Sequence, residues 1–77
     1  MILEHIAENL VLVTKQSMLS GKTSSMALPI RQGQVDYWQQ SGDLIQNVFP
    51  HLNADQREFL MTGITPDEWD SAFGGDE

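Results

Sequence analysis

Residues 53–73 read NADQREFLMTGITPDEWDSAF, and this stretch carries the strongest structural signals in the chain. Asn53 is a favoured N-cap residue, and Gln56, three positions later, is placed to return a hydrogen bond to the backbone of the cap. Gly63 is typical of the left-handed residue that ends a helix. The pattern therefore predicts a short helix between Asn53 and Gly63.

A second helix follows directly. Thr65 is placed as its N-cap, with Pro66 at the first helical position and Glu68 at the third, which matches a Ser/Thr-x-x-Glu capping box. Gly74 ends the helix. The apolar residues of the two helices are spaced to pack against each other and on the rest of the domain: Phe59, Leu60, Ile64, Trp69 and Phe73. The predicted role of all five is structural.

The N-terminal half favours β-structure. Residues 10–19 and 23–30 are rich in β-branched and apolar residues, and they flank a turn at residues 20–22. These features predict a two-stranded antiparallel β-hairpin over residues 10–30. Residues 1–9 have isoleucines four positions apart and are predicted as an N-terminal arm or short helix.

Two more helices are expected before residue 53. Apolar positions three apart in residues 31–40 favour a helix that Gly42 ends, and Asp43 is placed to cap a shorter helix that ends before Pro50. The predicted fold class is therefore α+β: the hairpin followed by a cluster of about four short α-helices, residues 31–73.

Length and composition set the domain organisation. A chain of 77 residues holds one core, so residues 10–73 form a single small domain, and residues 74–77 are expected to be a mobile acidic tail. There is no Cys, which fits a cytosolic protein. Residues 1–13 have no basic segment and no apolar run long enough for a signal peptide or a bilayer span. We expect a cytoplasmic protein without membrane association.

The charge is divided unevenly. The net charge of −7 comprises +1 in residues 1–31 and −8 in residues 32–77, where nine acids accompany the single base Arg57. Such a field repels nucleic acid and anionic membranes and favours a basic protein surface. The alternative is that the acidity only keeps a small protein soluble.

Three sequence patterns that could indicate a binding or catalytic site lack a feature that such a site requires. Residues 20–23, Ser-Gly-Lys-Thr, end as a phosphate-binding loop does, but the first Gly of that motif would have to stand where the sequence has Gln16. Neither histidine has a His or Cys four residues away, the spacing that helical metal ligation uses. Ser41, His51 and Asp55 supply the residue types of a triad without a nucleophile turn. We predict no catalytic residue, no cofactor and no metal site.

The pair of helices at residues 54–62 and 66–73 has the length of a helix-turn-helix. A recognition helix presents basic or amide side chains to DNA, whereas residues 66–73 contain three acids and no base, so we predict no direct nucleic-acid binding. Tyr37 adjoins Trp38 and cannot share its helix face, which makes it the expected surface aromatic. The predicted partner-binding residues are Asp67, Glu68, Asp70, Asp76, Glu77 and Tyr37.

Residues 44–52, LIQNVFPHL, and residues 57–70, REFLMTGITPDEWD, resemble a group of small tailed-bacteriophage proteins with no assigned function. The resemblance extends over roughly residues 14–73. This chain has Arg31 where such proteins usually have Thr or Ser, and its first dozen residues are additional. The resemblance implies a phage-encoded accessory protein in the host cytoplasm, and it supplies no catalytic residue.

The function expected from the sequence is therefore that of a non-enzymatic binder. It would inhibit or redirect a host or phage protein with a basic surface, such as a defence nuclease or another nucleic-acid-handling factor, and its acidic face would imitate nucleic-acid phosphates. A virion structural or assembly protein is the first alternative. A small hydrolase is the second.

Overall fold

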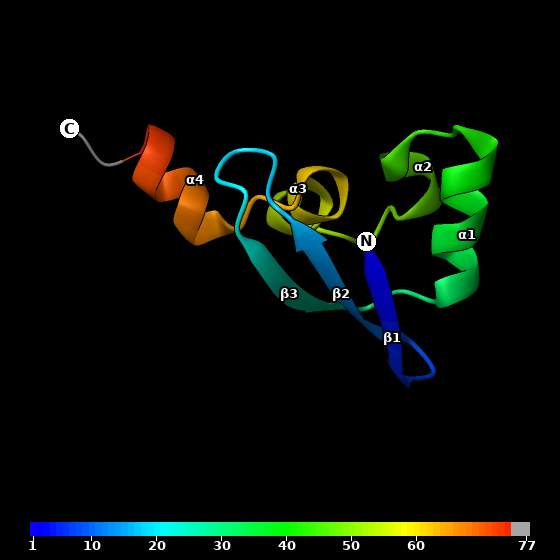
Figure 1. Cartoon of the computed structure of the whole chain (residues 1–77). Helices are drawn as coiled ribbons and strands as arrows, with labels where there is room; N and C mark the ends of the chain where they lie inside the picture. The colour runs from blue at the N-terminus through cyan, green and yellow to red at the C-terminus, as the bar shows by residue number, and fades with distance from the viewer. Residues whose placement is uncertain (75–77) are drawn as a thin grey trace.

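The computed structural model describes residues 1–74, which form a three-stranded antiparallel sheet and four helices (Figure 1). In chain order the elements are β1 (Ile2–Ala7), β2 (Leu10–Gln16), β3 (Thr23–Leu28), α1 (Gln32–Ser41), α2 (Ile45–Val48), α3 (Ala54–Thr62) and α4 (Pro66–Phe73). The predicted two-stranded hairpin is wrong, because a third strand completes the sheet in the order β1-β2-β3. The structure is α+β. Of the predicted tail, residues 75–77 lie outside the described residues.

The additional strand is β1, where an arm or short helix was expected. It pairs antiparallel with β2, from Ile2 opposite Thr14 to Ala7 opposite Leu10, with a bulge between His5 and Ala7. Without β1, the backbone hydrogen-bonding groups along one edge of β2 would be unpaired, and strand pairing satisfies them. The isoleucine spacing fits a helix. It gives no information about a pairing partner for a strand, so it could not predict β1.

The core lies between one face of the sheet and the helices. The register aligns Leu3, Val13 and Met26 across the three strands, and Val11 with Leu28 beside them, all on the covered face. The other buried members of the cluster come from the C-terminal half: Ile30, Val35, Phe49, Leu52, Phe59 and Leu60.

α3 packs on β2 and starts as the sequence predicts. The Asn53 side chain accepts a hydrogen bond from the backbone N–H of Gln56 at 2.8 Å, and the Gln56 side chain accepts one from the backbone N–H of Asn53 at 3.0 Å. The helix ends at Gly63, which has φ +78°. Phe59 and Leu60 are fully buried. The predicted capping box and the structural role of Phe59 are confirmed.

α1 ends at Gly42 as predicted, but α2 does not begin as expected. The N-cap of α2 is Leu44 rather than Asp43, whose carboxylate accepts from the Leu44 N–H at 3.0 Å and so lies one residue outside the helix. At the start of α1, Gln34 accepts a hydrogen bond from the N–H of Arg31 at 3.0 Å. A guanidinium has no acceptor, so only this half of a capping box forms.

The Arg31 side chain instead ties the start of α1 to the turn between β1 and β2. Its Nε donates to the Asn9 side chain at 2.7 Å, and its guanidinium lies 3.9 Å from the exposed carboxylate of Glu8. The described residues contain no helix long and apolar enough to cross a membrane.

Candidate partner-binding site

α4 contains three of the predicted partner-binding residues and is built by local interactions. The Thr65 hydroxyl accepts a hydrogen bond from the backbone N–H of Glu68 at 3.2 Å, and the Glu68 carboxylate accepts one from the N–H of Thr65 at 3.4 Å. Pro66 occupies the first turn, where its missing N–H is no loss. The predicted capping box is confirmed, so α4 begins at a defined residue and points in a fixed direction.

The base of α4 is fastened to the end of β2. The backbone N–H of Met18 donates to the carbonyl of Thr62 at 3.0 Å, and Ile64 is buried. Gly63 lies so close to β2 that a Cβ added to it would be 2.4 Å from the carbonyl oxygen of Gln16. The connection between α3 and α4 therefore has little freedom to move.

Beyond that base, α4 projects from the body of the molecule, and Figure 1 shows it in orange and red at the end remote from α1. None of its residues is buried. On the side toward the loop between β2 and β3, Ser20 donates a hydrogen bond to Glu68. A shallow hollow between loop and helix is lined by Leu19, Lys22 and Asp67 among others.

The Glu68 carboxylate is bonded within the chain. The hydrogen bond from Ser20 is the main cause of its lowered pKa, and Ser17, the backbone of Thr65 and the charge of Lys22 act in the same direction against a smaller effect of desolvation. Glu68 therefore stabilises the position of α4, whereas Asp67 and Asp70 are exposed.

The exposed face of α4 is aromatic. Trp69 and Phe73 lie one helical turn apart with ring centroids 4.6 Å apart, and they are 46% and 62% exposed. The prediction that both pack into the core is wrong. Their spacing identifies an apolar face, but the apolar face of α3 is already used by Phe59 and Leu60 against the sheet, and no residue of α4 is buried.

Two acids from α3 lie beside this aromatic face. A hollow of about 210 Å³ between α3 and α4 is lined by Trp69 with Asp55 and Glu58, and by Ala54, Ile64, Thr65 and Pro66. Asp55 and Glu58 could not be assigned to this surface from the sequence alone, because they are more than ten residues from Trp69. We call Trp69, Phe73, Asp70, Asp55 and Glu58 the α4 surface.

The remaining predicted site residues are not part of this surface. Tyr37 is 56% exposed, as expected of a surface aromatic, but it lies on α1 at the other end of the molecule (Figure 1). Asp76 and Glu77 lie outside the described residues.

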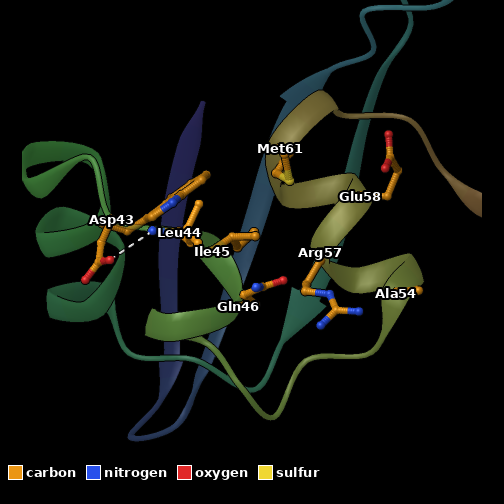
Figure 2. Close-up of a pocket in the computed structure, with 9 residues that line it drawn as sticks. Asp43, Leu44, Ile45, Gln46, Ala54, Arg57, Glu58 and Met61 are labelled. Carbon is orange, nitrogen blue, oxygen red and sulfur yellow. Dashed lines mark hydrogen bonds between the residues drawn. The ribbon is translucent and has the colours of Figure 1, made fainter.

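A larger groove of about 530 Å³ separates α2 from α3. Figure 2 shows Leu44 and Ile45 on one side of it and Arg57 and Met61 on the other. The rim also carries Asp43 and Glu58, so the charges around this groove are mixed. The groove therefore offers apolar contact area, but its mixed charges favour neither an anionic nor a cationic ligand.

The sequence motifs considered for chemistry have structural roles. Residues 20–23 form the end of the loop between β2 and β3, and Thr23 starts a strand, so the motif lies in the hairpin connection as predicted. The connection is longer than expected, because β2 ends at Gln16 and not at residue 19. His51 Nε2 lies 2.6 Å from the carbonyl oxygen of Pro29, and Ser41 Oγ accepts from the N–H of Asp43 at 3.1 Å. Within residues 1–74 no group of three or more His, Asp or Glu is placed to hold a metal ion.

Comparisons with protein families, with curated proteins and with solved structures give no match for this chain.

Proposed function

We propose that this protein is a non-enzymatic, stoichiometric binder that inserts the aromatic face of α4 into an apolar groove of a partner protein whose rim is basic. The observation that carries the proposal is the exposed pair Trp69 and Phe73 on a helix that is capped and fastened at its base. Exposed aromatics on a rigid helix lose little conformational entropy on binding, and Trp is among the commonest binding hot spots.

Charge defines the partner's rim. Asp70 lies between the two aromatics in sequence, and Asp55 and Glu58 border the hollow beside Trp69. Lysines or arginines around the partner's groove would meet these carboxylates, which speeds association and selects against acidic partners. The aromatic pair supplies the affinity in this proposal and the acids supply the selectivity.

The biological setting follows from the resemblance to small phage proteins. The protein acts in the cytoplasm of a bacterial host, where it inhibits or redirects a host or phage protein. A nuclease, a transcription component or another nucleic-acid-handling factor presents basic residues to its substrate. Carboxylates held against a basic rim of this kind would occupy the positions of phosphates and displace the nucleic acid.

The test starts with affinity purification of the tagged protein from expressing cells, with the parent and two variants in parallel. Trp69→Ala with Phe73→Ala removes the aromatic face, and Tyr37→Ala is the matched control because it removes an equally exposed aromatic from α1. We expect the parent and the Tyr37 variant to retain the partner and the double variant to bind at least about 100-fold more weakly, as hot-spot losses do. Equal retention by all three would exclude the α4 surface.

The charge contribution is measured on the purified complex. Asp70→Lys should weaken binding at low salt, and its loss relative to the parent should shrink as salt screens the charges. Asp36→Lys is the control, since it makes the same change at an exposed residue of α1. Binding that is unaffected by both salt and Asp70→Lys would show that the partner's rim is not basic.

A further inference from the structure

The hollow between α3 and α4 has the dimensions of a single side chain. Its volume of about 210 Å³ is below the roughly 300 to 1,000 Å³ of pockets that hold a small-molecule ligand. Its apolar lining comprises the buried side chain of Ile64, Ala54 of α3 and Pro66 of α4. The hollow therefore suits the end of one side chain of a partner better than a free metabolite or a peptide segment.

The charged groups that line this hollow are all acidic. Asp55 and Glu58 of α3 contribute two carboxylates. Arg57 is the only base in residues 32–77, and it lines the groove between α2 and α3 instead. The two carboxylates therefore set the sign of the electrostatic potential in the hollow.

Neither carboxylate is neutralised within the described part of the chain. The one ion pair in residues 1–74 joins Arg31 to Glu8, near the turn between β1 and β2. The Thr62 hydroxyl lies 3.1 Å from Oε2 of Glu58, but a hydroxyl brings no positive charge. A cation that entered the hollow would therefore meet two uncompensated negative charges.

Trp69 adds an aromatic ring to the same hollow. The ring is 46% exposed and packs against Phe73, with centroids 4.6 Å apart, which restricts its movement. Among the aromatic side chains, an indole attracts a cation most strongly, because the faces of its ring carry negative partial charge. An indole and two carboxylates around one small hollow are complementary to an organic cation.

We propose that this hollow receives the guanidinium group of one arginine of the partner protein. The inference rests on the proposed function, because the arginine belongs to the partner that the aromatic face of α4 contacts. It identifies one basic side chain of that partner, which enters the hollow beside Trp69. Arg and Trp are both enriched among binding hot spots, and hot spots tend to pair across an interface.

The chemistry of the hollow favours a guanidinium over the other cations. A guanidinium is planar, stacks on aromatic rings and donates to carboxylates from a rigid fork, whereas the ammonium of a lysine is compact and more strongly hydrated. Two carboxylates supply fewer oxygen ligands than Ca²⁺ requires, which disfavours a metal ion.

The first turn of α4 also borders the hollow, and its helix dipole opposes the binding of a cation. Thr65 and Pro66 belong to this turn. Asp67 and Glu68 lie in the same turn and offset its partial positive charge. The carboxylates of α3 therefore remain the dominant charges beside Trp69.

Titration of the full chain with N-acetyl-arginine methylamide tests the proposal without the partner. In proton–nitrogen correlation NMR at constant ionic strength, the indole N–H of Trp69 and the backbone N–H of Asp55 should shift together. The expected Kd is on the order of 10 mM, as one cation–π contact and exposed ion pairs provide. The indole N–H of Trp38 should not shift, because Trp38 lines the groove between α2 and α3 and not this hollow.

Two further probes separate charge from shape. N-acetyl-citrulline methylamide has nearly the shape of the arginine probe without its charge, and it should bind at least about fivefold more weakly. The corresponding lysine probe has the charge without the planar fork, and it should bind at least about twofold more weakly.

A charge variant and its control locate the site. Asp55→Asn with Glu58→Gln removes both charges with little change of shape, and it should raise Kd for the arginine probe at least about fivefold. Asp36→Asn is the control, because it makes the same change at an exposed residue of α1, and it should bind like the parent. Circular dichroism checks that both variants fold.

Four outcomes would overturn the proposal. The Trp69 indole could fail to shift up to about 50 mM probe. The citrulline or lysine probe could bind as well as the arginine probe, or the double variant could bind as well as the parent. Finally, exposed acidic residues throughout the chain could respond with the same Kd, which would indicate general ionic association.

The titration also distinguishes this inference from the proposed function. Arginine binding without a partner in the affinity purification would exclude the proposed function and leave the hollow as a guanidinium site. Retention of a partner through Trp69 and Phe73 without arginine binding would overturn the present inference alone.

Discussion

Replacing Gly63 by Ala should strongly destabilise the protein, because two separate costs meet at this residue. Its φ of +78° lies in the left-handed region, where an L side chain costs about 1 to 2 kcal/mol. The added Cβ would also stand 2.4 Å from the carbonyl oxygen and 2.8 Å from the carbonyl carbon of Gln16. Neither contact is tolerable, so the backbone must shift.

Moving the backbone costs free energy because Gln16 is held in place. It is the last residue of β2 and pairs with Thr23, and the next residue, Ser17, donates its N–H to Lys22 at 2.8 Å. Overpacking against such a site costs about 1 to 3 kcal/mol, which brings the total to about 2 to 5 kcal/mol. A domain of this length has a free energy of unfolding of about 4 to 12 kcal/mol in all.

Gly42→Ala is the matched control. Gly42 ends α1 with φ +72°, but an added Cβ there meets nothing within 4 Å. It should therefore cost only the conformational term, about 1 to 2 kcal/mol. With an m value of about 1 kcal/mol per M urea, the unfolding midpoint should fall about 1 to 3 M further for Gly63→Ala than for Gly42→Ala. Equal midpoints would refute the close approach of Gly63 to β2.

Three further predictions concern the helices. Phe59→Ala should cost about 3 to 5 kcal/mol because Phe59 is fully buried, whereas Trp69→Ala should change the free energy of unfolding by less than about 1 kcal/mol, and urea unfolding of the two variants compares them directly. A large cost for Trp69→Ala would place its ring in the core. Thr65→Ala should cost about 1 kcal/mol through loss of the N-cap, and no measurable change would mean that α4 begins elsewhere. Because the folded-state pKa of Glu68 is lowered, its contribution to stability is present above the pKa of the unfolded chain and is lost as pH falls through the folded value. Urea midpoints measured from neutral to acidic pH should therefore decline less for Glu68→Gln than for the parent, and parallel declines would contradict the bond to Ser20.

The two capping boxes could be predicted from the sequence, whereas the hydrogen bond between Glu68 and Ser20 could not. The sequence alone located Asn53 with Gln56 and Thr65 with Glu68, because each pair interacts over three residues and the geometry of a helix start brings them together wherever the helix lies. The second contact of Glu68, with Ser20, spans 48 residues and depends on where α4 is fastened.

The first strand and the exposure of the aromatic face of α4 were decided by tertiary structure. β1 exists because β2 offers it an unpaired edge, and the spacing of Ile2 and Ile6 says nothing of that edge. Trp69 is exposed for a related reason. Helical periodicity shows which side of α4 is apolar, but the opposing surface that would bury it must come from elsewhere in the chain.

The sequence therefore determined where the helices of residues 53–73 begin and end and the acidic character of the helical half. These features depend on hydrogen bonds and charges among neighbouring residues. The tertiary structure decided which apolar faces are covered, and it brought Asp55 and Glu58 of α3 beside Trp69. Burial is a property of two surfaces that meet, and a single chain segment specifies only one of them.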